Sequence, residues 1–433
     1  MPSPQRNRQR VVITGAGCVS PVGADVAQTW RSMAEGRGGI GPITLFDATP
    51  FPVRIAAEAA EQGLAPLGEP WTNGGAVPRQ TRFALAAARE AMESSGLADA
   101  SSDPRRFGVF LGCGEIFPDV REMASRLLKS INGQGFDLSL FMRHALHGAR
   151  LDSIPEEEPY TACLMVAAAA GAEGPVANYL TACTSSTQAV GNAAEVIRRG
   201  QADVMLAGGS HSMIHPLGVG GLCALGVLSG ANDRMGRAMR PFDRQRDGFV
   251  VGEGGAVVLL EGLEHALARK ADIWAEVRGY ACTHDAYRIT DTHYEARGYV
   301  QCLRAALDDA GLDAEAIGYI NAHGTGTPLN DRLETLALKH VFGRHAWSIP
   351  ISSTKSMVGH ATTACGALEL VATLMTLREN ILPPTINYEN PDPECDLDYI
   401  PNTAREQSPT HVMTSNLGFG GQNAALILSR FTG

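Results

Sequence analysis

The chain has 433 residues, 44% of them hydrophobic, with 48 glycines and a formal net charge of −10 at pH 7. This composition indicates a globular protein with enough chain for two or three domains, and the acidic balance argues against binding nucleic acid or an anionic membrane surface. Nine cysteines, an odd number with no CxxC pair, argue against a disulfide framework or a zinc ribbon and favour a reducing compartment.

Residues 1–10 (MPSPQRNRQR) are basic and polar and are predicted to form an N-terminal tail. They hold no apolar stretch before a cleavage site, as a secretory signal would. The longest apolar run, YTACLMVAAAAGAEG at 160–174, is too short to span a bilayer. We therefore expect a cytoplasmic protein with no membrane partner.

Strand-like and helix-like segments then alternate along the chain. Helical periodicity covers 82–96 and 187–200, each ending on a glycine, Gly96 and Gly200, in the position that terminates helices. This alternation predicts an α/β protein with mainly parallel sheets that are covered on both faces. The predicted strands are RVVITGAG (10–17), FGVFLG (107–112), ADVMLAGGS (202–210), GGAVVLLE (254–261) and NAALILSRF (423–431).

The two halves of the chain resemble each other. The strand FGVFLG is echoed by IGYINAHG (317–324), NYLTACTSS (178–186) by the strand and turn of 349–375, and GGAVVLLE by NAALILS. A period near half the chain indicates a duplicated domain rather than a solenoid. We expect the halves to be 11–261, with the nucleophile, and 262–433. Ligands bind beyond the carboxyl ends of strands in such sheets, so the turns should meet at one cleft.

Cys183 lies where the strand of NYLTACTSS gives way to a helix. A buried cysteine is often only a small hydrophobic residue, and that interpretation remains open. The alternative is a nucleophile, because the positive end of a helix and nearby N–H donors lower the pKa of a thiol.

The second half supplies candidate partners for a thiol nucleophile. His323 follows a strand in a turn of Gly and Thr that includes Thr325 and Thr327, and Lys355 and His360 stand before the next helix. A buried lysine would keep both histidines neutral. The glycine-rich turn 418–421 could present an N–H to an oxyanion. Such a set suits acyl transfer through a thioester followed by carbanion chemistry, whereas a hydrolase needs one histidine and an orienting Asp or Asn.

These residues resemble the β-ketoacyl-acyl-carrier-protein synthases, the condensing enzymes of fatty-acid and polyketide assembly. The similarity runs from VVITGAG to GFGGQNAAL, and its order of motifs is specific. It implies a thiolase-like αβαβα sandwich of two duplicated halves. The motifs that carry the resemblance are TACTSS, PLGVGG, RPFDRQRDGFVVGEGG, NAHGTGT, KSMVGH and PPTINYENPDPECDLDYIPN.

The resemblance also implies roles for individual residues. Cys183 would accept the acyl group, with its own amide and that of Phe419 as the oxyanion hole and Phe419 as a gate. His323 and His360 would drive decarboxylation of malonyl-carrier protein. Lys355 would pair with Glu334, and the residues that bind the phosphopantetheine arm would be Thr325 and Thr327.

No metal or redox cofactor is expected, because the carrier protein brings the phosphopantetheine. The Cys-His-His set points to an elongating synthase rather than a starter-type enzyme. The expected partners are acyl carrier protein and a second subunit, in a homodimer or in a heterodimer with a ketosynthase-like chain. The alternative is a subunit that binds carrier protein but needs a separate partner for activity. Fatty-acid and polyketide pathways both remain open.

Several positions depart from the family pattern. Glu115 stands where relatives have a small or apolar residue in the acyl pocket, so it either pairs at a subunit interface or faces an acyl group that is not a plain saturated chain. Gly226 replaces an arginine that docks the carrier, a role that Arg79, Arg82 or Arg143 could take. His144 and His147 lie one helical turn apart without acidic or thiol neighbours, which disfavours a metal site.

Overall fold

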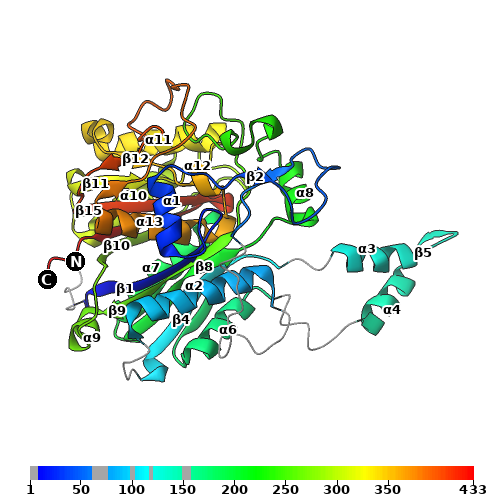
Figure 1. Ribbon diagram of the computed structural model, residues 1–433, viewed down its shortest axis with the longest axis horizontal. Helices are drawn as coiled ribbons and strands as arrows, with labels where there is room; N and C mark the ends of the chain where they lie inside the picture. Colours follow the sequence, from blue (N-terminus) through cyan, green and yellow to red (C-terminus); the bar gives the residue numbers. More distant parts are fainter. Residues whose placement is uncertain (1–7, 61–76, 98–102, 117–119, 149–157) are drawn as a thin grey trace.

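The computed structural model describes residues 8–60, 77–97, 103–116, 120–148 and 158–433 (Figure 1). Most of the predicted tail therefore lies outside the described residues. One sheet of ten strands runs through the molecule, in the order β12-β11-β15-β16-β10-β1-β9-β8-β4-β7. The strands are β1 (Val11–Val19), β4 (Phe107–Cys113), β7 (Val176–Tyr179), β8 (Val204–His211), β9 (Gly254–Gly262), β10 (Ala275–His284), β11 (Ile317–Asn321), β12 (Ile351–Ser352), β15 (His411–Gly418) and β16 (Gln422–Ser429).

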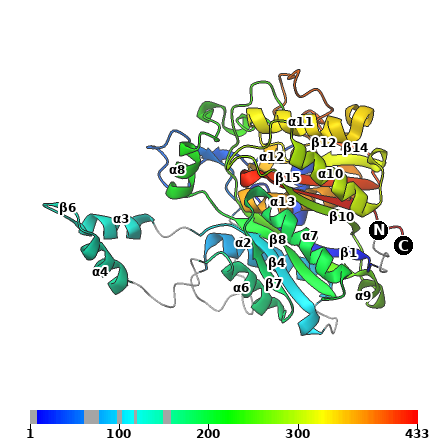
Figure 2. The ribbon, with the colours of Figure 1, turned by 180° about the vertical axis from the view of Figure 1, so that it is seen from behind.

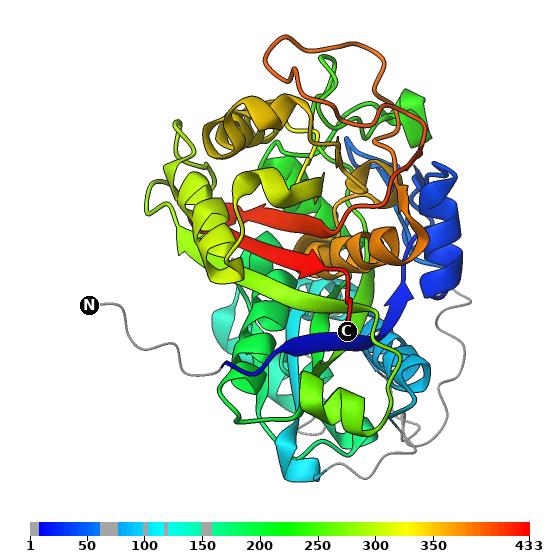
Figure 3. The ribbon, with the colours of Figure 1, turned by 90° about the vertical axis from the view of Figure 1, so that its left-hand side faces the viewer.

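The strand order is mirrored about its centre, where β1 and β10 pair over only two register positions. Each strand of the first half then has a counterpart at the same distance from the centre. Strands β9 and β16 are such a pair, as are β4 and β11, and β7 and β12. These pairs are the segments that echo one another in the sequence. Figure 3 shows β1 in blue below β16 in red, on either side of the junction.

Helices lie between and outside the two halves of the sheet (Figures 1 and 2). The central layer holds α7 (Ser185–Arg198) and α13 (Cys365–Glu379), which contact each other and strands of both halves. The outer layers hold α2 (Arg79–Ser95) and α6 (Thr161–Ala170) on the first half, and α10 (Arg297–Ala310) and α11 (Pro328–Phe342) on the second. This is the predicted thiolase-like αβαβα sandwich.

Local sequence explains how these elements end and pack. Gly96 and Gly200 both adopt the left-handed conformation after a helix, with φ of 65° and 70°, as predicted. The central strands β1, β8 and β9 are buried along their whole length, as expected for strands covered on both faces. The prediction of mainly parallel sheets is wrong, because β1 pairs antiparallel with β9 and β10, and β9 pairs antiparallel with β8. Within the described ranges, no helix has both the length and the apolar character needed to cross a bilayer.

Smaller elements complete the fold. An arm made of α3 (Val120–Lys129), the hairpin β5 (Ile131–Asn132) and β6 (Gly135–Phe136), and α4 (Leu138–Gly148) projects from the body (Figures 1 and 2). The remaining elements are α1 (Val26–Ala34), α8 (Pro216–Ala224), α9 (Leu263–Ala268), α12 (Lys355–Val358), and the short strands β2 (Gly41–Pro42), β3 (Ile55–Ala56), β13 (Ile381–Leu382) and β14 (Arg405–Glu406).

Candidate active site

Cys183 lies in a single 3-10 turn between β7 and α7. The preceding residue, Ala182, has a positive φ of 51°, a conformation that costs a non-glycine residue free energy. The turn is held by side chains, since the Thr181 N–H donates to Ser185 Oγ at 2.8 Å and the Ser185 hydroxyl donates to the Ala182 carbonyl at 2.7 Å. This tight elbow aims the thiol at the cavity instead of into the sheet.

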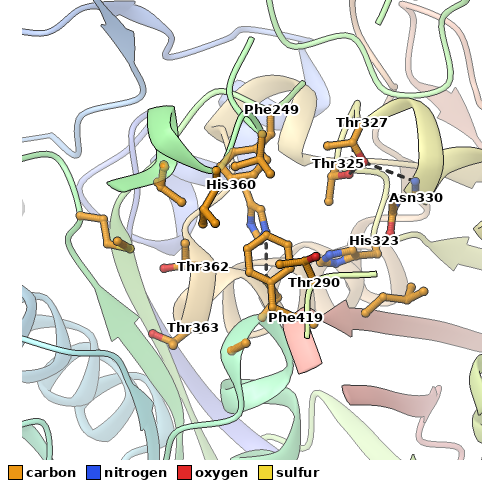
Figure 4. A pocket seen from close by; sticks show the side chains of 18 of the residues that line it. Phe249, Thr290, His323, Thr325, Thr327, Asn330, His360, Thr362, Thr363 and Phe419 are labelled. Carbon is orange, nitrogen blue, oxygen red and sulfur yellow. Dashed lines mark hydrogen bonds between the residues drawn. The ribbon is translucent and has the colours of Figure 1, made fainter. Parts of the chain in front are cut away.

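Two imidazoles from the second half meet the thiol. His360 Nε2 lies 3.1 Å from Cys183 Sγ, and the rings of His323 and His360 are perpendicular with centroids 5.3 Å apart. All three side chains are buried. Figure 4 shows both histidines facing the same cavity as Phe419. The structure thus brings together three residues that are up to 177 positions apart in sequence.

The thiol is not acidified by its position. Burial raises the pKa of Cys183 to about 11, although Lys355 and the backbone N–H of Phe419 act in the opposite direction. The sequence-based expectation of a lowered pKa at a helix start is therefore wrong for the free thiol. A base must take its proton, and His360 Nε2 is within hydrogen-bond reach.

Both histidines are neutral in this site. Burial, and next the nearby Lys355 ammonium, hold the pKa values of His323 and His360 well below the ordinary 6.5. A neutral imidazole can donate one hydrogen bond from one nitrogen and accept at the other. The predicted electrostatic effect of Lys355 is present, but desolvation is the larger cause.

Lys355 makes three contacts through its ammonium. Nζ donates to the His323 carbonyl at 2.7 Å and to His323 Nδ1 at 3.1 Å, and it forms a very short ion pair with Glu369. The predicted partner, Glu334, is thus wrong. Glu369 lies on α13, one helical turn after the start of that helix at Cys365, and Lys355 is the first residue of α12.

Glu334 instead holds the turn that carries His323. Its two carboxylate oxygens accept the N–H groups of His323 and Gly324, each at 2.7 Å. Burial raises the pKa of Glu334 to about 7, against the opposing effect of these N–H donors. Glu334 therefore orients the backbone of the turn, while Glu369 forms the ion pair with Lys355.

The amides expected to form an oxyanion hole lie beside the thiol. The backbone N–H groups of Phe419 and Cys183 both favour the thiolate of Cys183 and so face its sulfur. A Cβ placed on Gly418 would come within 3.2 Å of the Cys183 nitrogen, which shows how closely the two segments approach. The Gly420 N–H donates to the Ile289 carbonyl at 2.6 Å, which fixes the turn.

The site opens into a cavity of about 790 Å³ (Figure 4). Thr325 and Thr327 line it, with their hydroxyls 2.9 Å apart, and Thr327 also caps the start of α11. Apolar side chains line it as well. Among them are Leu180, Met213, Leu222, Leu225, Val227 and Phe249.

The residues singled out where the sequence departs from the family pattern lie in three different places. Glu115 is exposed to solvent at the edge of the cavity, and its carboxylate has no hydrogen-bond or ion-pair partner among the residues that the structure describes. Arg79 is tied to the buried Glu253 by contacts of 2.5–3.0 Å, so it is not a simple solvated cation. Arg143, His144 and His147 lie on α4, in the projecting arm.

Sequence reasoning missed Glu369, Asn416 and Cys365, which lie close to His323. The signal for Glu369 is a carboxylate in the otherwise apolar stretch GALELVATL of a buried helix, where a charge needs a partner. Asn416 gave a weaker signal, because a polar residue near the end of a strand is common. Its contacts are visible only in the tertiary structure.

Two groups of described side chains have the donor types of a metal site. Cys183, His323 and His360 form one, and His323, Cys365 and Glu369 form the other, each with ligand atoms within 4.8 Å of one another. The donors do not fit a divalent cation well, because the Lys355 ammonium already occupies His323 Nδ1 and Glu369. A cation there would be repelled by that charge.

The chain was compared with known proteins. The family description "Beta-ketoacyl synthase, N-terminal domain" matches residues 8–266, and "Beta-ketoacyl synthase, C-terminal domain" matches residues 274–389. The 3-oxoacyl-[acyl-carrier-protein] synthase 2 of Coxiella burnetii is 43% identical over 98% of this chain and 99% of its own. The tetracenomycin polyketide synthase ketoacyl synthase alpha subunit of Streptomyces glaucescens is 42% identical over 98% and 97%.

Solved structures are similar over the same length. One is a type II polyketide synthase acyl-carrier protein in complex with its ketosynthase bound to the hexaketide, and its matching chain has a TM-score of 0.86 and 34% identity over 98% of this chain and 100% of that one. Another is the ishigamide ketosynthase/chain length factor, with a TM-score of 0.84 and 31% identity over 98% and 100%.

Proposed function

Because the chain belongs to the beta-ketoacyl synthase family and is a condensing acyltransferase, we propose that Cys183 holds the acyl group while His323 and His360 act on a malonyl thioester. The observation that carries this assignment is the meeting of Cys183 Sγ and His360 Nε2 at 3.1 Å, with the His323 ring beside them. Fatty-acid and polyketide chains both remain as products, since relatives of both kinds match equally well.

Acyl transfer comes first. His360 Nε2 takes the Cys183 proton, and the sulfur attacks the carbonyl of the incoming thioester. The amides of Cys183 and Phe419 stabilise the oxyanion. The C–S bond to the carrier then breaks, and the proton held by His360 passes to the departing carrier thiolate. His360 is neutral again and Cys183 is acylated.

Condensation follows on the second substrate. The Nε2–H group of His323 donates to the thioester oxygen of the malonyl group while its C–C bond to the carboxylate breaks and CO2 leaves, and His360 donates to the same oxygen once its single ring proton has moved from Nδ1 to Nε2. The resulting carbanion attacks the acyl carbonyl on Cys183. The new C–C bond forms as the C–S bond breaks, and the Cys183 thiolate takes up a proton from solvent, the one proton that the condensation consumes. Thr325 and Thr327 hydrogen-bond the pantetheine arm in the cavity.

The partners of this reaction are part of the proposal. The carrier is an acyl carrier protein, which a structural neighbour binds according to its description. The second subunit is a copy of this chain or a ketosynthase-like chain. The arm supports such a subunit, because it exposes large apolar side chains to solvent. These are Leu128, Ile131, Phe136, Leu138 and Leu146, between 53% and 69% exposed.

The experiment uses the purified chain with acyl- and malonyl-carrier protein. Mass spectrometry should find one acyl group on Cys183 and none on Cys183→Ala, and a ketoacyl product should follow. His323→Ala should acylate but release little CO2. An acyl group on another residue, or undiminished CO2 release by His323→Ala, contradicts the assignment.

The alternative function is a subunit that is inactive alone. The alpha-subunit and chain-length-factor descriptions of two relatives favour it. Acylation of Cys183 without any ketoacyl product, and product formation on adding a second subunit, would establish this alternative.

A further inference from the structure

Asn416 lies on β15 beside His323 and is fully buried. The Thr187 hydroxyl on α7 forms a very short hydrogen bond with its Oδ1. An amide oxygen can only accept, so this contact commits the oxygen to Thr187 and fixes which way the amide faces. The amide nitrogen must then point toward the site.

The Nδ2 group has acceptors on that side. It lies 2.6 Å from Glu369 Oε2 and 3.2 Å from His323 Nδ1, with Cys365 Sγ at 3.6 Å. Its two hydrogens therefore reach the Glu369 carboxylate and, in a longer contact, the space between His323 and Cys365. Asn416 stands between a carboxylate and an imidazole and donates to both.

Two donors converge on the same histidine nitrogen. Lys355 Nζ lies 3.1 Å from His323 Nδ1, and Asn416 Nδ2 lies 3.2 Å from it. Neither a protonated ammonium nor an amide NH2 accepts a hydrogen bond. The lone pair of the neutral ring must therefore be on Nδ1, and its proton on Nε2.

We infer that Asn416 is a positioning residue that keeps the proton of His323 on Nε2, where it can donate to the substrate thioester oxygen. The competing arrangement is close at hand, because oxygen, sulfur and nitrogen atoms of Glu369, Cys365 and His323 lie within 4.8 Å of one another. If the Glu369 carboxylate reached Nδ1, it would draw the proton there. A lone pair on Nε2 would then face the negative charge that develops during decarboxylation.

This role rests on the proposed function of His323. It predicts that Asn416→Asp slows the reaction more than Asn416→Leu, whereas a role in packing alone predicts the reverse. Asn416→Asp keeps the shape but places an acceptor beneath Nδ1. Asn416→Leu keeps most of the volume and removes all hydrogen bonds. We expect CO2 release from malonyl-carrier protein to fall about 100-fold in Asn416→Asp, as when an oxyanion donor is lost. In Asn416→Leu it should fall only about tenfold, because the one hydrogen bond to His323 is lost while Lys355 still donates to Nδ1.

Two readouts accompany the rate. Acylation of Cys183, which does not use His323, should remain close to wild type and shows that each variant is folded. Nitrogen NMR of protein labelled with 15N-histidine, with the His323 signals assigned from a His323→Gln sample, should show Nε2 protonated in the wild type and Nδ1 protonated in Asn416→Asp.

Different results would contradict the role of Asn416 and the proposed condensing function. A wild-type His323 protonated on Nδ1 overturns the role of Asn416 whatever the variants do. So does Asn416→Asp releasing CO2 as fast as Asn416→Leu when both variants acylate Cys183 like the wild type. Wild-type protein that neither acylates Cys183 nor releases CO2, alone or with a second subunit, contradicts the proposed function instead.

Discussion

At the scale of single residues, Lys355 is the charge that sets the protonation of the site. Its ammonium lies within hydrogen-bond distance of His323 and is itself stabilised by Glu369, so that its pKa is raised although burial opposes the charge. A fixed positive charge at this point disfavours a second one on either imidazole. The histidines therefore remain donors of a single proton over a wide pH range.

Removing this charge should move the acid limb of decarboxylation. In Lys355→Met the pKa values of His323 and His360 rise, but burial, the larger cause of their depression, still holds them below 6.5. A neutral histidine is lost when the pH falls through its pKa, so activity should disappear at a higher pH than in the wild type. The pH profile of CO2 release measures this.

Two controls make that profile interpretable. Lys355→Met with Glu369→Gln avoids an unpaired buried carboxylate, which separates the electrostatic effect from misfolding. Lys270→Met removes an exposed lysine far along the chain. An acid limb that stays in place in both Lys355 variants would show that burial alone keeps the histidines neutral.

Glu115 bears on the choice of acyl group. Its carboxylate shares the cavity with Met213, Leu222 and Leu225, and a charge beside a saturated chain is unfavourable. We expect Glu115→Leu to acylate from octanoyl-carrier protein about tenfold faster, equivalent to about 1.4 kcal/mol. Glu115→Gln should give a smaller gain.

The same variants decide between the two interpretations of Glu115. If it pairs at a subunit interface, Glu115→Leu will weaken subunit association, seen by sedimentation velocity, and leave acyl preference unchanged. A gain with octanoyl groups and unchanged association would place the carboxylate next to the acyl chain.

At the scale of elements, the crossing of α7 and α13 brings the two halves of the site together. Both helices start at the site, and Cys183 and His360 precede them. The helices approach closely at Gly366, where a Cβ would lie 2.0 Å from Thr187 Oγ1 and 2.7 Å from Asn416 Oδ1. The small residue is needed because the two side chains that orient the amide occupy the space.

Gly366→Ala should therefore destabilise the protein and disturb the site. We expect a loss of about 1–3 kcal/mol in the free energy of unfolding, typical of an overpacked core, measured by urea denaturation. Gly221→Ala on α8 is the control, because nothing lies within 4 Å of its added Cβ. Equal stability of the two variants would mean that α13 shifts freely.

At the scale of the whole molecule, the projecting arm is the least self-contained part of the fold. Helices α3 and α4 pack on each other and leave a row of apolar side chains in solvent. A monomer rarely exposes such a surface unless a partner covers it. The projection of the arm away from the body is plain in Figures 1 and 2.

Charged substitutions on the arm should prevent subunit association. We expect Leu128→Glu combined with Leu146→Glu to sediment as a monomer, whereas the wild type, alone or with the proposed second subunit, should sediment as a dimer. Leu267→Glu on α9, half exposed on the body, is the control. A double variant that still associates like the wild type would show that the arm is not the contact surface.

The sequence by itself, with the family resemblance it carries, determined the architecture and picked out the three side chains that meet at the site. Strand and helix periodicities are local, and so are the turns that carry Cys183, His323 and His360, so each could be recognised within about ten residues. The duplication could also be predicted from the repeated segments, and the structure places these segments at mirrored positions in the sheet. The predicted division at 261 and 262 and the roles of the site residues stay predictions.

Only the tertiary structure decided the charges of the site. Glu369 rather than Glu334 pairs with Lys355, Asn416 lies beneath His323, and the Cys183 thiol has a raised pKa instead of a lowered one. A pKa and an ion pair depend on desolvation and on distances summed over every neighbouring segment. Those neighbours come from α7, α12, α13 and β15, which become adjacent only when the two halves of the chain fold together.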